Sequence, residues 1–144
     1  MKRFERPVTP AEISTVLQGV VDDLVPGGRT TYVDVLPTID AQANECFPLV
    51  EQRINTEGGR AEVGWSLWEL PTLFVEAEFH SVWRRPSGEL LDVAPKNHET
   101  SKILFLPDPI RQYEGRQVNN VRKALRNDPL LNTYLETFSS EFDL

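Results

Sequence analysis

The sequence predicts an α+β fold in which helices flank an antiparallel sheet. Apolar residues recur at helical spacing near both ends of the chain, whereas shorter β-branched and aromatic runs occupy residues 61–107 between them. Prolines and glycines separate these runs as turn signals and do not gather in a linker. An order of helices, then a meander of strands, then helices is typical of the α+β class.

Length and composition fit one domain over residues 1–144. A chain of 144 residues is too short for two separate cores, and 40% apolar with 26% charged residues is a globular composition. The net charge of −7 repels phosphate backbones, so we expect no nucleic-acid partner. No apolar run approaches the roughly 18 residues of a membrane span, and no apolar signal segment follows Met1. We therefore expect a cytoplasmic protein with no membrane partner.

The first helix is predicted over residues 10–24, after an extended arm over residues 1–8. Thr9 suits the N-cap, Pro10 suits the first helical position, and Glu12 completes a capping box. Apolar residues then recur at helical spacing until the glycine-rich stop that follows the helix.

A short strand and a second helix are predicted next. The β-branched and aromatic segment 31–36 is typical of a strand. Asn44 suits the N-cap of a helix that would run to about Glu57, with Gly58-Gly59 as its stop. Cys46 then lies in the first turn of this helix.

Four strands are predicted in the middle of the chain, over residues 63–70, 73–84, 89–94 and 103–106. Pro86-Ser87-Gly88 marks the turn between the second and third of these. The last 30 residues have helical spacing, in one segment over 118–125 and another over 130–138.

Candidate catalytic residues lie in the segment 76–93 and at Cys46. His80 and Asp92 are near the middles of consecutive predicted strands, and a turn centred on about Pro86 would place them opposite each other. Both side chains would then leave the same face of the sheet within reach of a hydrogen bond. A carboxylate there would orient the imidazole and stabilise its charged form. The only cysteine opens a helix, where the macrodipole favours a thiolate. Cys46, His80 and Asp92 can thus serve as nucleophile, base and orienting residue.

This arrangement resembles the transglutaminase-like branch of the papain-like cysteine enzymes. In that superfamily a cysteine opens a helix, and a His and an Asp follow on adjacent antiparallel strands. The matching segments over residues 44–96 are His80-Ser81-Val82-Trp83, Gly88 and Asp92-Val93-Ala94-Pro95. The chain is also similar to small uncharacterised bacterial and phage proteins that carry the same His-x-Val-Trp and Leu-x-Asp segments.

The resemblance implies a papain-like core with a catalytic part over residues 44–96. It implies a cysteine-dependent hydrolase or acyl-transfer enzyme that acts on a peptide, a glutamine side chain, another small-molecule amide or a thioester. No cofactor is expected. The Cys46 N–H would be one oxyanion donor, and Gln42 or Asn44 would supply a second one from its side chain. We expect hydrolysis or deamidation and not crosslinking, because a domain this small leaves little room for a second, amine substrate.

A non-catalytic binding module of the same fold is the alternative. Trp65, Trp68 and Trp83 lie on adjoining predicted strands. They are expected mainly in the core, because aromatic side chains dominate core area. Otherwise they would line a groove beside the cysteine, through which a phage or mobile-element factor could engage a host protein or a small ligand.

A divalent metal site is a third hypothesis. Glu76, Glu78 and His80 alternate along one strand and so share a face, where Cys46 could join them. Alternating glutamates are more often a solvent face, so no metal ligand is assigned. One of them, Glu78, could instead flank the substrate groove and select a cationic or amide substrate. His98 is the reserve base if His80 is buried.

Overall fold

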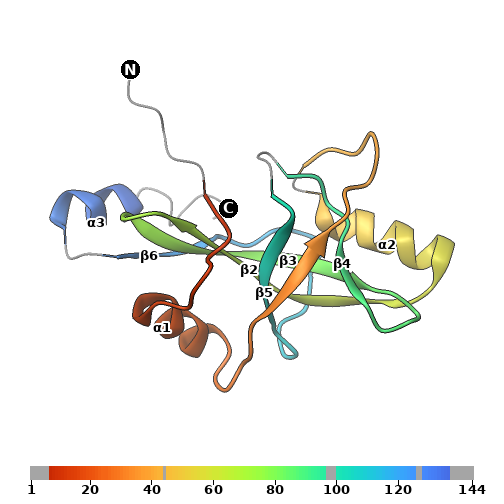
Figure 1. The fold of residues 1–144 in the computed structure, drawn as a ribbon, viewed down its shortest axis with the longest axis horizontal. Helices are drawn as coiled ribbons and strands as arrows, with labels where there is room; N and C mark the ends of the chain where they lie inside the picture. Colours follow the sequence, from red (N-terminus) through yellow and green to blue (C-terminus); the bar gives the residue numbers. More distant parts are fainter. Residues whose placement is uncertain (1–6, 44, 97–99, 126–127, 137–144) are drawn as a thin grey trace.

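A computed structural model describes residues 7–43, 45–96, 100–125 and 128–136. These residues form three helices, α1 Thr15–Leu24, α2 Cys46–Glu57 and α3 Pro129–Glu136. They also form six strands, β1 Thr31–Val35, β2 Arg60–Leu70, β3 Phe74–Arg84, β4 Leu90–Asp92, β5 Lys102–Pro107 and β6 Val121–Ala124 (Figure 1). The predicted α+β class is confirmed. Every helix in the described part of the chain is too short or too polar to span a bilayer.

Five strands close into a mixed barrel in the order β2-β5-β1-β4-β3, and β3 returns to pair with β2. The sixth strand, β6, extends the sheet from β3. The expected antiparallel meander is correct for the hairpins β2–β3 and β3–β4. It is wrong for the sheet as a whole, because β1 inserts between β5 and β4 and runs parallel to β4.

Three clusters of buried apolar side chains hold these layers together. One cluster draws on β1, β2, β3 and β5 and fills the barrel interior with Val33, Trp68, Val82, Ile103 and Phe105. The helix α1 packs its apolar face on outward-facing side chains of β2, β3 and β5. The helix α2 covers the outer side of β3 and β4, and Figure 1 shows it beside β4 and away from α1.

The predicted start of the first helix is wrong. The helix α1 begins at Thr15, with the Ser14 hydroxyl accepting a hydrogen bond from the Leu17 N–H at 3.1 Å. The Thr9 hydroxyl instead donates to the Lys102 carbonyl at 2.7 Å, and Val8 forms a bridge with Glu69 of β2. The expected capping box is therefore absent, and Val8 and Thr9 instead bind this part of the chain to β2 and β5. Residues 1–6 of the expected arm lie outside the described residues.

The predicted helix over 118–125 is also wrong. Residues 121–124 form β6, which pairs with residues 74–77 of β3. The backbone N–H and C=O groups of residues 121–124 form hydrogen bonds with this edge of β3. A helix over the same residues would leave the edge without these partners. The second C-terminal segment is helical as expected where it is described, over α3.

Candidate functional site

The β3–β4 hairpin brings His80 and Asp92 together. Its register pairs Trp83 with Leu91 and Arg84 with Leu90, so Asp92 falls opposite Val82. The expected direct pairing of His80 with Asp92 is therefore wrong by two residues. An offset of two residues keeps both side chains on the same face of the sheet. His80 Nε2 lies 2.9 Å from Asp92 Oδ2, and both side chains are buried. The expected contact between these two residues is present.

The strands around His80 leave a gap beside it. β3 pairs along its whole length with β2 on one side. On the other side β4 pairs with residues 83–84 and β6 with residues 74–77. Among the described residues, no strand covers residues 78–82 on that side, and the Gln117 side chain fills part of the gap by donating to the Phe79 carbonyl at 2.8 Å. His80 therefore lies beside the gap between β4 and β6 along this edge of β3.

Asp92 is held by three donors. Its Oδ1 accepts the Ala94 N–H at 3.0 Å, while Oδ2 contacts His80 and forms an ion pair with Lys96. The Lys96 side chain is only 10% exposed. Lys96 was not expected in this site, because a spacing of four residues indicates an ion pair on a helix, whereas Asp92 ends the strand β4 and Lys96 lies in the loop after it.

Charge is stabilised at this buried pair. Burial alone would lower the pKa of His80, but its interactions with Asp92 and, to a smaller extent, with Cys46 outweigh burial and raise that pKa to about 10. Burial alone would raise the pKa of Asp92, but His80 and Lys96 lower it to about 2. At neutral pH the two side chains are therefore an imidazolium and a carboxylate.

Cys46 is the first residue of α2 and is 4% exposed. It packs with Trp83 and Leu91 in the cluster beneath this helix. Cys46 contributes to the raised pKa of His80, so the two side chains are close enough to interact electrostatically. They approach from different sides of β3, because His80 shares the face of Val82 whereas Cys46 packs against Trp83 on the opposite face. No hydrogen bond joins the Cys46 sulfur to His80 among the described contacts. The His80 nitrogen that Asp92 leaves free is Nδ1, which lies 3.9 Å from Glu78 Oε1.

Comparisons with protein-family models, curated proteins and solved structures found no match. The candidate site therefore rests on its own geometry.

The two glutamates on β3 lie in different environments. Glu76 accepts hydrogen bonds from Arg122 Nε at 2.7 Å and from Asn120 Nδ2 at 3.1 Å. Glu78 is partly buried, and burial raises its pKa above the ordinary value. In the described ranges no group of three His, Cys, Asp or Glu side chains is placed to hold a metal ion. The hypothesis of a metal site at Glu76, Glu78 and His80 gains no support.

The three tryptophans do not line one groove. Trp65 belongs to the cluster beneath α1, Trp68 to the barrel interior and Trp83 to the cluster beneath α2. Each is at most 5% exposed. Trp65 and Trp68 point to opposite faces of β2 because they are an odd number of positions, three, apart along the strand. Only Trp83 packs beside Cys46.

Of the two side chains expected as oxyanion donors, only Gln42 lies among the described residues. Gln42 is exposed on the loop that precedes α2. Asn44, which was also the predicted N-cap, and His98, the reserve base, lie outside the described residues. The residue at the N-cap position is Glu45, whose side chain makes no capping hydrogen bond.

Proposed function

We propose that the protein is a cysteine-dependent acyl-transfer enzyme that hydrolyses an amide or a thioester. The observation that carries this proposal is the buried contact of 2.9 Å between His80 Nε2 and Asp92 Oδ2, with Cys46 at the start of a helix in electrostatic reach. Asp92 occupies one ring nitrogen and leaves Nδ1 for proton exchange with the substrate. A papain-like core of the transglutaminase-like type is the finer fold that accompanies this proposal.

In the first half of the reaction, the Cys46 thiolate attacks the carbonyl carbon and forms a carbon–sulfur bond. The carbonyl oxygen takes the displaced electron pair. When the tetrahedral intermediate collapses, the bond to the leaving nitrogen or sulfur breaks, and the His80 imidazolium gives its proton to that leaving group. The raised pKa of His80 suits this step, because it keeps the imidazole protonated at neutral pH before attack.

In the second half, a water molecule attacks the thioester formed on Cys46. Neutral His80 accepts a proton from this water, the carbon–sulfur bond breaks, and a carboxylic acid leaves. The thiolate and imidazolium are then restored. The substrate class is a peptide, a glutamine side chain, a small-molecule amide or a thioester, and transfer to water is favoured over transfer to an amine by the small size of the domain.

A non-catalytic binding module is the second candidate. The burial of Cys46 and the lack of a hydrogen bond from its sulfur to His80 favour it. In this case the His80–Asp92–Lys96 cluster serves only the fold, and the protein binds a protein or small ligand without a covalent step. The three buried tryptophans would not form the binding surface.

The rate of iodoacetamide labelling from about pH 5 to about pH 9 tests the proposal, because labelling reports the thiolate. With one cysteine in the chain, the signal belongs to Cys46 alone. We expect fast labelling of the native protein below neutral pH and its loss in His80→Ala. A thiol that reacts only after denaturation would exclude the enzyme and leave the binding module.

The matched control is His98→Ala, because the chain has two histidines. This variant should label as the unmodified protein does. Loss of fast labelling in His98→Ala, with His80→Ala unaffected, would contradict the assignment of His80 as the partner of the thiol. Circular dichroism of both variants shows whether each remains folded.

A further inference from the structure

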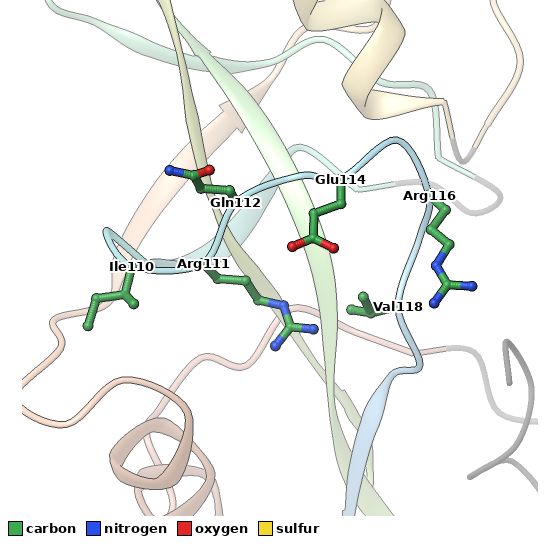
Figure 2. A pocket seen from close by; sticks show the side chains of 6 residues that line it. All are labelled: Ile110, Arg111, Gln112, Glu114, Arg116 and Val118. Carbon is green, nitrogen blue, oxygen red and sulfur yellow. The ribbon is translucent and has the colours of Figure 1, made fainter.

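A cavity of about 410 Å³ lies against the segment that connects β5 to β6. Its lining is Ile110, Arg111, Gln112, Glu114, Arg116 and Val118, and Figure 2 shows the Arg111, Glu114 and Arg116 side chains extending to the same side of this segment. A second cavity of about 400 Å³ shares Arg111, Arg116 and Val118 with it. Two arginines and one glutamate make this a positively charged pocket on a chain whose net charge is −7.

Arg111 is held in place by aromatic rings and by its own backbone. Its guanidinium lies 5.6 Å from the Trp65 ring centre and 5.4 Å from that of Phe79. The Asp108 carboxylate fixes this arrangement, since its Oδ1 accepts the Ile110 and Arg111 N–H groups and its Oδ2 accepts the Trp65 indole N–H at 3.1 Å. Asp108 thus accepts its hydrogen bonds from neutral donors, and no ion pair joins it to the Arg111 guanidinium among the described residues.

Neither guanidinium in the pocket has a charge partner among the described residues. Several arginines elsewhere in the described structure pair with glutamates, as in Arg53–Glu57, Arg84–Glu62, Arg85–Glu89 and Arg122–Glu76. Two unpaired guanidinium groups that share a cavity attract an oxyanion, because each offers several charge-assisted hydrogen-bond donors.

The rest of the lining restricts which oxyanion fits. The second cavity adds the apolar side chains of Leu24, Trp65 and Val121 to Val118. These side chains suit the hydrocarbon part of a ligand. The Glu114 carboxylate faces the same space and repels a dianion more than a monoanion.

We propose that this pocket binds a small organic acid, with its carboxylate between Arg111 and Arg116 and its hydrocarbon chain against Leu24, Val118 and Val121. A carboxylate has one charge and two oxygens, which matches two guanidinium groups beside one acidic side chain. This inference does not depend on whether Cys46 is a nucleophile. The pocket lies near that site nonetheless, because Tyr113 stacks on Phe47, the residue after Cys46, with ring centres 3.8 Å apart.

Calorimetric titration with hexanoate tests the proposal, with 1-hexanol and inorganic phosphate as comparison ligands. Hexanoate should bind at least about tenfold more tightly than 1-hexanol, because the alcohol lacks the charge that the arginines recognise. Equal binding of the alcohol would overturn the proposal. Phosphate binding as tight as that of hexanoate would also overturn it, since the apolar wall would then contribute nothing.

Arg116→Gln and Arg111→Gln identify the pocket as the place of binding. Each should weaken hexanoate binding by about tenfold, because a charge-assisted hydrogen bond is lost. Arg116 makes no aromatic contact in the described structure, so Arg116→Gln tests the charge even if Arg111→Gln disturbs packing. Arg29→Gln, which removes an exposed cation on the turn after α1, should leave binding unchanged. Unchanged binding in Arg116→Gln would place hexanoate elsewhere and refute the proposal.

Discussion

Asp92 shows how a single residue fixes the charge of the candidate site. One of its carboxylate oxygens contacts His80 and forms an ion pair with Lys96, and the other accepts a hydrogen bond from the Ala94 N–H. The Asp92 side chain is fully buried. Two cations around one buried anion stabilise it, whereas each cation alone would be costly to bury. Lys96 therefore stabilises the Asp92 carboxylate, while its own charge opposes protonation of His80.

Asp92→Asn should destabilise the protein and lower the pKa of His80. The change leaves Lys96 buried without its anionic partner, which we expect to cost about 3 kcal/mol of unfolding free energy. It also removes the attraction to Asp92 that offsets the effect of burial on the pKa of His80. Urea unfolding and an NMR titration of the His80 ring measure the two effects.

The double variant Asp92→Asn/Lys96→Met separates charge from packing in this prediction. It should regain part of the lost stability, because the unpaired cation is gone. Asp34→Asn is the matched control, since Asp34 is an exposed carboxylate on the neighbouring strand β1, and it should change stability by less than about 0.5 kcal/mol. A double variant no more stable than Asp92→Asn would contradict the ion-pair explanation.

At the level of elements, the sequence predicted those helices, turns and hairpins that depend on residues close to one another in sequence. The turn at 86–88 and the two-residue period of the strands were enough to place His80 and Asp92 on one face. The parallel pairing of β1 with β4 and the strand β6 were not predicted, because both depend on partners distant in sequence. The helical spacing of Val118, Val121 and Leu125 carries no information about the free edge of β3 that residues 121–124 complete.

Gly64→Ala tests how closely β2 and β5 approach. A Cβ at Gly64 would lie 2.1 Å from the Leu106 carbonyl oxygen, so the strands would have to separate. We expect a loss of at least about 2 kcal/mol in unfolding free energy.

Gly19→Ala is the matched control, because a Cβ added at Gly19, on the exposed side of α1, meets no atom within 4 Å. It should stabilise the protein by up to about 1 kcal/mol, because alanine favours the helix. Equal effects of the two variants in thermal unfolding would refute the steric argument.

At the level of the whole molecule, barrel closure joins the candidate site to strands distant in sequence. Asp92 ends β4, which pairs with Val35 of β1, and β1 pairs in turn with β5. The cluster in the barrel interior draws on β1, β2, β3 and β5 together. Cooperative unfolding should therefore remove the His80–Asp92 contact and the core at once, so the charge of this pair contributes to global stability.

Global stability should consequently depend on pH through the shifted pKa values of His80, Asp92 and Glu78. The pKa of His80 is raised from 6.5 to about 10, so its contribution is complete below pH 6.5 and is lost as pH rises towards 10. The pKa of Asp92 is lowered from 3.8 to about 2, so its contribution is complete above pH 3.8 and is lost as pH falls towards 2. Glu78, whose pKa is raised from 4.5, adds a loss as pH rises above that value.

Urea unfolding at a series of pH values separates these contributions when the protein is compared with His80→Gln. In the variant the decline between pH 6.5 and 10 should be smaller, because no imidazolium keeps its proton in the folded state. The acidic decline should become smaller without disappearing, because His80 makes the largest contribution to the lowered pKa of Asp92 and Lys96 supplies the rest. An alkaline decline of the same size in His80→Gln would mean that His80 is not held charged in the folded protein, and the thiolate–imidazolium chemistry proposed for Cys46 would lose its basis.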